Sequence, residues 1–142
     1  MPGKSDYLET SVLNSTLRGV AFPVPTTGSN FVSLHTADPL DAGTGVEVTG
    51  GAYARVAVSR VTASAAFGAP VDNAGSMRTS NVAAVTFPNP TAAWGTVTHF
   101  GVFDAVTLGN LMYSGVIGTS RAIAAGDTAP SFAAGTLTID EG

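Results

Sequence analysis

Short runs of β-branched and aromatic residues, separated by turn residues, occupy the chain from residue 30 to its end and constrain the fold most. Runs of this length bounded by Gly, Pro, Asn and Asp are typical of strands joined by turns. The pattern predicts a mainly β fold, a compact antiparallel β-sandwich or jelly-roll-like barrel of roughly six to eight strands. The runs are NFVSLHTA (30–37), YARVAVSRV (53–61), VAAVTF (82–87), WGTVTHFGVF (94–103), LMYSGVI (111–117) and TLTI (136–139).

One segment near the N-terminus has the spacing of a helix. Ser5 is a suitable N-cap, and Gly19 can end the helix in a left-handed conformation. We expect residues 1–20 to form a helical arm and residues 21–142 a single β-domain. The arm either lies across its own sheet or reaches a neighbouring subunit, and both alternatives stay open. Its apolar stripe is a candidate interface: Leu8, Val12, Leu13 and Leu17.

The stretch WGTVTHFGVFD (94–104) raises the question of an active site, because His99 and Asp104 lie close together in it. If the stretch is a strand, one face carries Val97, His99, Gly101 and Phe103, and the other carries Thr96, Thr98, Phe100 and Val102. Both faces are largely apolar, which favours a central strand covered on both sides. We therefore expect His99 to be a half-buried structural residue, and Gly95 and Gly101 to mark a bulge or a close backbone approach.

The sequence lacks the parts that the common catalytic mechanisms need. It has no Cys and no G-x-S-x-G motif, and its only imidazoles are His35 and His99. The Gly-rich loop 37–51 carries three acids, Asp38, Asp41 and Glu47, without the alternating ligands of a calcium loop. We predict no catalytic, cofactor-binding or metal-ligating residues, and we interpret these acids as contact surface.

Composition narrows the set of partners. Charged residues make up 11% of the chain, compared with about 25% in ordinary soluble domains. A surface so poor in charge suggests that other chains cover part of it. The net charge of −4 argues against a nucleic-acid partner. No apolar run is long enough to cross a membrane, and the first residues lack the apolar core of a secretory signal.

The order of several motifs resembles a family of small structural proteins of tailed bacteriophages, loosely described as tail-fibre or minor structural proteins. The motifs are LRG (17–19), LHTADP (34–39), GGAYARVAV (50–58), FPNPTAAWGTVTHFGVFDA (87–105), GNLMYSG (109–115) and AGDTAPSFAAGTLTI (125–139). The resemblance extends over about residues 5–140 and implies a β-rich, non-enzymatic component of the virion.

Within the virion, a capsid decoration (cement) protein is the first hypothesis, because a fibre usually needs a longer shaft than 142 residues can build. The expected partners are then the major capsid protein and two copies of the chain itself in a homotrimer, with no small-molecule substrate. The expected location is the capsid surface of a virion whose proteins are made in the host cytoplasm. A tail component is the alternative, and a carbohydrate-binding module is a third hypothesis. Trp94 is a candidate contact residue in each case.

Overall fold

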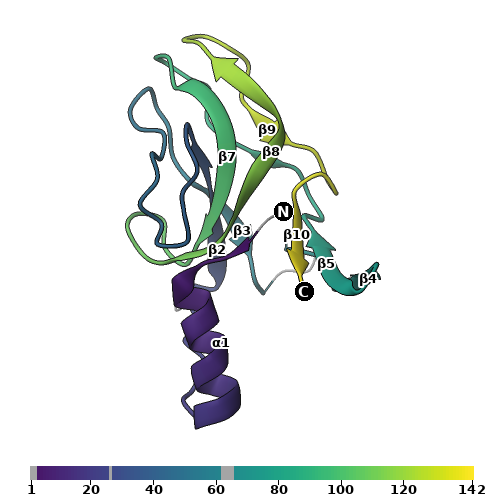
Figure 1. Cartoon of the computed structure of the whole chain (residues 1–142). Coiled ribbons are helices and arrows are strands. Elements are labelled where there is room, and N and C mark those ends of the chain that lie inside the picture. Colours follow the sequence, from purple (N-terminus) through teal and green to yellow (C-terminus); the bar gives the residue numbers. More distant parts are fainter. Residues whose placement is uncertain (1–2, 26, 62–65) are drawn as a thin grey trace.

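The computed structural model describes residues 3–25, 27–61 and 66–142, so Met1 and Pro2 of the predicted arm lie outside it. One helix and ten strands follow one another along these residues (Figure 1). They are β1 (Gly3–Lys4), α1 (Asp6–Arg18), β2 (Ser29–His35), β3 (Val56–Ser59), β4 (Val71–Asn73), β5 (Ser76–Ser80), β6 (Val85–Thr86), β7 (Gly95–Phe103), β8 (Leu111–Ile123), β9 (Ser131–Phe132) and β10 (Thr138–Glu141).

The strands form a sandwich-like body, which confirms the prediction of a mainly β, antiparallel fold with one helix. The large sheet has the order β1-β8-β7-β2-β3. A three-stranded sheet, β10-β5-β4, and a two-stranded sheet, β6-β9, lie opposite it and share its core. Each neighbouring pair of strands in these sheets is antiparallel. Among the described residues no sheet closes into a barrel, so the sandwich is the correct alternative.

The core fills the space between the large sheet and the two smaller sheets. β2 contributes Val32 and Leu34, and the second layer contributes Phe87, Leu137 and Ile139. Aromatic rings connect the two layers: the ring centroids of Phe100 and Phe132 are 6.2 Å apart at an angle of 73°. Edge-to-face pairs of this kind add to the free energy gained by burying the rings.

Two irregularities in the pairing of β7 with β8 change which side chains of β7 face the core. The first lies between Val97 and His99, and the second between Val102 and Phe103. As a result Val97 joins Phe100 and Val102 in the core, although simple alternation places Val97 on the opposite face. The prediction that β7 is a central strand covered on both sides is confirmed, but the assignment of Val97 to the other face was wrong. The cause is the bulge, which shifts the alternation by one residue.

Helix α1 begins and ends where the sequence predicts. Ser5 is its N-cap and accepts a hydrogen bond from the amide of Leu8, and Gly19 adopts φ = 68° at its C-terminus. The first turn is fixed to the body, because the Ser5 amide donates to the Met112 carbonyl and its hydroxyl to the Leu111 carbonyl. The rest of the helix projects away from the sheets (Figure 1). The helix therefore does not lie across its own sheet.

Candidate functional site

Loop 37–51 folds over the face of the large sheet that points away from the core, which we call the outer face. The loop returns to β2, where the Val48 amide donates to Leu34 and the Thr36 amide donates to Val46. Its middle reaches the start of α1, where the Asp6 amide donates to the Asp41 carbonyl. The loop is thus a cover that is hydrogen bonded to the rest of the chain at its middle and near its end.

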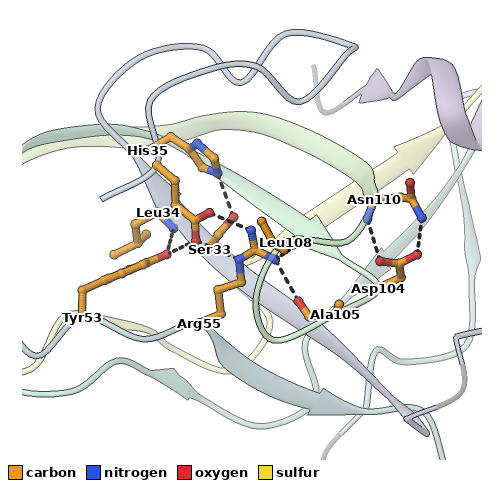
Figure 2. Close-up of polar contacts among 10 residues, drawn as sticks. Ser33, Leu34, His35, Tyr53, Arg55, Asp104, Ala105, Leu108 and Asn110 are labelled. Carbon is orange, nitrogen blue, oxygen red and sulfur yellow. Dashed lines mark hydrogen bonds and ion pairs between the residues drawn. The ribbon is translucent and has the colours of Figure 1, made fainter. Parts of the chain in front are cut away.

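A cluster of polar side chains lies between this loop and the outer face (Figure 2). The guanidinium of Arg55 pairs with the carboxylate of Glu47 through two bonds, Nε–Oε1 at 2.8 Å and Nη2–Oε2 at 2.7 Å. The Tyr53 hydroxyl donates to Glu47 Oε1 at 2.9 Å and accepts from the Leu34 amide at 3.0 Å. Arg55 also lies 3.6 Å above the ring of Phe103. The two parallel hydrogen bonds hold Glu47, and with it the loop, against Arg55, and the cation–π contact holds Arg55 against β7.

Arg55 fastens a second loop, the one that joins β7 to β8. Its Nη1 donates to the carbonyl oxygens of Ala105 and Leu108, both at 2.8 Å. In the same loop the Asp104 carboxylate accepts from the Asn110 amide at 2.7 Å and from the Asn110 side chain at 2.8 Å (Figure 2). Asp104 is therefore a loop-closing residue. The left-handed positions of this loop are Leu108 and Gly109.

Ser33 and His35 form a buried pair that resembles a nucleophile with its base. Ser33 Oγ and His35 Nε2 are hydrogen bonded at 2.8 Å, because residues two apart on a strand share a face. However, the two residues are only 0% and 1% exposed, and His35 Nδ1 has no partner to orient the ring. A catalytic pair needs substrate access and an oriented base. The geometry therefore supports a packing role for the two side chains beneath the loop. The only sign of this pair in the sequence is that its members are two residues apart.

Close packing fixes the positions of this pair. The ring of His35 stacks on Phe103 with centroids 6.2 Å apart. A Cβ atom at Gly101 would come within 2.7 Å of Ser33 Oγ and 3.1 Å of His35 Nε2. The expectation of a close backbone approach at Gly101 is confirmed, since only glycine leaves room for the two side chains.

Burial is the main cause of the pKa shifts of His35 and Tyr53 in the cluster. It lowers the pKa of His35 to about 4, so this imidazole is neutral at pH 7. Burial alone raises the pKa of Glu47, but the hydrogen bond and the charge of Arg55 outweigh it and the pKa is lowered. Burial raises the pKa of Tyr53. The cluster thus contains one ion pair and an uncharged histidine.

His99 lies beside the cluster, opposite His35 in the pairing of β2 with β7. It is half-buried, and its Nδ1 is hydrogen bonded to Thr98 Oγ1 at 2.8 Å. This is the structural role that the sequence predicts for it. Among the described residues no group of three or more His, Asp or Glu side chains is placed to hold a metal ion.

The predicted interface residues lie in three different environments. Leu8 and Trp94 are each 4% exposed and belong to the core. The Trp94 indole N–H donates to the Gly51 carbonyl at 2.9 Å, and its ring meets Tyr53 edge to face. In the isolated chain neither side chain is on the surface. The sequence could not separate them from surface residues, because apolar side chains are equally suited to both places.

The acidic residues of loop 37–51 have separate tasks. Asp38 Oδ1 accepts from the Leu40 amide at 2.9 Å and stabilises the turn at the start of the loop. Asp41 is exposed and contributes its backbone carbonyl to the helix start, whereas Glu47 is engaged with Arg55. Two of the three acids, Asp38 and Asp41, therefore present exposed side chains to the surroundings.

Five of the fourteen large apolar side chains that are exposed in the described residues lie on the projecting helix or directly behind it. Leu13 and Leu17 are 56% and 77% exposed, whereas Val12 packs against the core. The segment 20–25 that follows the helix adds three more exposed apolar side chains: Val20, Phe22 and Val24. We call α1 together with segment 20–25 the stalk. The second half of the stalk was not among the predicted interface residues, because prolines such as Pro23 and Pro25 are typical of a linker.

The comparison with known families gives the class of the chain: it is a structural protein of the tailed-bacteriophage virion. Residues 3–140 match the model of the family Gp80, described as podophage GP4 fiber I protein gp80. The match covers nearly the whole chain, so the chain belongs to this family. The predicted resemblance to small phage virion proteins is confirmed. No curated protein matches the chain.

One further structural fact concerns membranes. In the residues that the structure describes, no helix has the length and apolar character needed to cross a bilayer.

Proposed function

We propose that the chain is a non-catalytic subunit of a phage tail fibre, and that its stalk makes the contacts with other chains of the virion. The observation that carries the proposal is the match of residues 3–140 to a family described as a fibre protein. This description favours the tail over the capsid surface, which was the first hypothesis from the sequence.

The distribution of apolar surface supports the assembly role of the stalk. Large exposed apolar side chains rarely form a contiguous patch on a monomer without a binding function. Here five of them belong to one projecting element: Leu13, Leu17, Val20, Phe22 and Val24. The charges of the stalk, Asp6, Glu9 and Arg18, all lie on the helix, so segment 20–25 is uncharged, which favours an apolar contact with another protein.

The interior of the body supports a structural rather than a catalytic role. Its buried pair of a serine hydroxyl and an imidazole, Ser33 and His35, is closed off by loop 37–51. Trp94, the residue on which the carbohydrate-binding hypothesis depended, has its ring against Tyr53 in the core. A sugar that stacks on a tryptophan needs an open ring face. The geometry therefore supports neither a catalytic role for Ser33 and His35 nor a carbohydrate-binding role for Trp94.

The copy number of the chain in purified virions tests the proposal. Quantitative mass spectrometry against the major shell protein measures it directly. A tail-fibre subunit should be present in a few dozen copies or fewer. Hundreds of copies in a simple ratio to the shell protein would instead support capsid decoration, and absence from the particle would contradict both.

A further inference from the structure

Residues 38–46, which we call the loop middle, cover the outer face but are weakly held. Nearly all of these residues are exposed or half-buried. Within the described chain, two backbone hydrogen bonds join the loop middle to its neighbours. The Asp6 amide donates to the Asp41 carbonyl, and the Thr36 amide donates to the Val46 carbonyl. A segment with so few buried contacts opens at a smaller cost in free energy than the core.

The loop middle lies close to His35, and the two share Leu111 as a neighbour. A Cβ atom at Gly43 would come within 3.2 Å of Leu111 Cβ. A Cβ atom at Gly101 would come within 3.0 Å of Leu111 Cδ1 and within 3.1 Å of His35 Nε2. Because His35 is only 1% exposed, its imidazole is shielded from water while the loop is closed.

The hydrogen bonds of His35 suit a neutral imidazole and not a charged one. Its Nε2 is bonded to Ser33 Oγ at 2.8 Å (Figure 2), whereas its Nδ1 is buried and has no partner. A neutral imidazole has one N–H, but a protonated imidazole has an N–H on both nitrogens. With the loop closed, the second N–H of a protonated His35 would be buried without an acceptor, which costs free energy.

The charges around His35 do not offset this cost. Four charged or titratable groups face it from the loop, from the segment before β3 and from β7: Glu47, Asp38, Arg55 and His99. The carboxylate of Glu47, the residue opposite His35 in the pairing of the loop with β2, is already bound to Arg55 by two hydrogen bonds. From β8 the neighbour is Leu111, which is uncharged. Burial therefore outweighs the carboxylates and lowers the pKa of His35 to about 4.

We propose that protonation of His35 opens the loop middle, so that acid lifts residues 38–46 from the outer face while the sandwich stays folded. In the open form water accepts hydrogen bonds from both N–H groups of the imidazolium, so the proton binds this form more tightly and raises its population. Opening also separates the Asp41 carbonyl from the Asp6 amide and thereby loosens the base of the stalk. The inference does not depend on the proposed tail-fibre function, which copy number tests separately.

Hydrogen exchange of backbone amides tests the proposal, measured residue by residue by NMR on the full chain between pH 7 and pH 4. The reporters are the amides of Asp6 and Thr36, which donate to the loop middle. The reference is the amide of Trp94, which donates to the Ile123 carbonyl in the body. After correction for the intrinsic pH dependence of exchange, the protection of both reporters should fall about 100-fold over this range.

Low concentrations of urea separate opening of the loop from unfolding of the chain. Local opening exposes little surface, so exchange at Asp6 and Thr36 should depend weakly on urea. Exchange at Trp94 needs a larger unfolding and should depend strongly on urea. The two reporters should also be protected about 10-fold less than Trp94, or less still, at each pH. An equal response of all three amides to urea would overturn the proposal, because the loop would then open only when the chain unfolds.

Two variants identify the group that takes up the proton. His35→Gln should keep the protection of the reporters nearly constant from pH 7 to pH 4, because glutamine does not titrate. His99→Gln is the matched control and should lose protection as the wild type does. If His35→Gln does not fold, His35→Leu, which also takes up no proton, replaces it. The proposal is wrong if the reporters of the wild type show no pH dependence, or if removing the His35 imidazole leaves that dependence unchanged.

Discussion

Strand β7 and the stalk contain similar apolar side chains, yet the structure uses them in opposite ways. In β7, Phe100 and Val102 are 3% and 1% exposed and lie in the core. In the stalk, Leu17 is 77% exposed and has solvent on most of its surface. The same hydrophobic effect therefore stabilises the folded chain in one region and is available for association in the other.

The two regions also differ in how firmly their surroundings hold them. Both faces of β7 are covered, by the second layer on one side and by loop 37–51 with its Arg55 cluster on the other. Helix α1 is attached to the body through its first half, by hydrogen bonds of Ser5 and Asp6 and by the packing of Leu8 and Val12. The difference separates a packed body from an element whose apolar side chains are left exposed. Substitutions in β7 should therefore affect stability, and substitutions in the stalk should affect assembly.

The largest loss of stability is expected for Phe100→Ala. The ring is buried between the two layers and contacts Phe132, so its removal leaves a cavity in the core. The free energy of unfolding should fall by about 3–5 kcal/mol, measured by denaturant titration. A loss below about 1 kcal/mol would mean that the core around β7 repacks easily, and the comparison with the stalk would lose its basis.

A loss of similar size is expected when the wild-type protein is acidified. The folded-state pKa of His35 is lowered by burial to about 4, below its ordinary value of 6.5. The unfolded chain therefore binds the proton more readily, and stability is complete above pH 6.5 and declines as the pH falls toward 4. The expected decline is about 3 kcal/mol. Denaturant titrations at a series of pH values measure it.

His35→Gln tests whether this residue is responsible. The variant should lose most of the pH dependence between pH 6.5 and 4, although its stability at pH 7 is lower because the packing on Phe103 changes. His99→Gln leaves His35 in place and is the matched control, which should retain the slope. Equal slopes in all three proteins would show that His35 is not the group that titrates.

Breaking the fastening of loop 37–51 should have a smaller effect. Glu47→Gln removes the charge that faces Arg55, whose side chain is only 7% exposed. Arg55 keeps its bonds to two carbonyl oxygens, so we expect a loss of about 1–3 kcal/mol. Lys4→Met breaks the more exposed pair with Glu141 and is the control, with an expected loss of less than about 1 kcal/mol. Equal losses in both variants would contradict the fastening role of the Arg55 cluster.

The sequence predicted the elements of the body well where a local pattern defines them. The helix boundaries followed from Ser5 and Gly19, and each of the six predicted runs overlaps a strand. Strands β1, β4, β5 and β9 were missed, because strands of two to five residues carry too little alternation to be recognised. Their existence depends on pairing with distant residues, which one local window cannot show.

The candidate site was harder to predict, because it depends on contacts between distant residues. Arg55 meets Glu47 across 8 positions, and it meets Ala105 across 50 positions. Nothing in the spacing of these residues indicates the cluster. The apolar stripe of the helix was predicted, but not its division: Leu8 faces the core and Leu17 faces solvent. That division follows from the angle at which the helix leaves the body, which tertiary packing decides.

The smallest effect on stability, and the largest on assembly, is expected for Leu17→Asp. The side chain is far more exposed than buried, so the free energy of unfolding should change by no more than about 0.5 kcal/mol. Incorporation into virions, measured in particles assembled with the variant as the only copy, should nevertheless fall strongly, because a charge in the stalk must be desolvated on contact. Leu108→Asp, at a position 86% exposed in the loop between β7 and β8, is the matched control and should be incorporated normally. If both variants are incorporated equally well, the exposed apolar surface of the stalk is not the contact element, and the difference between the two regions is one of stability alone.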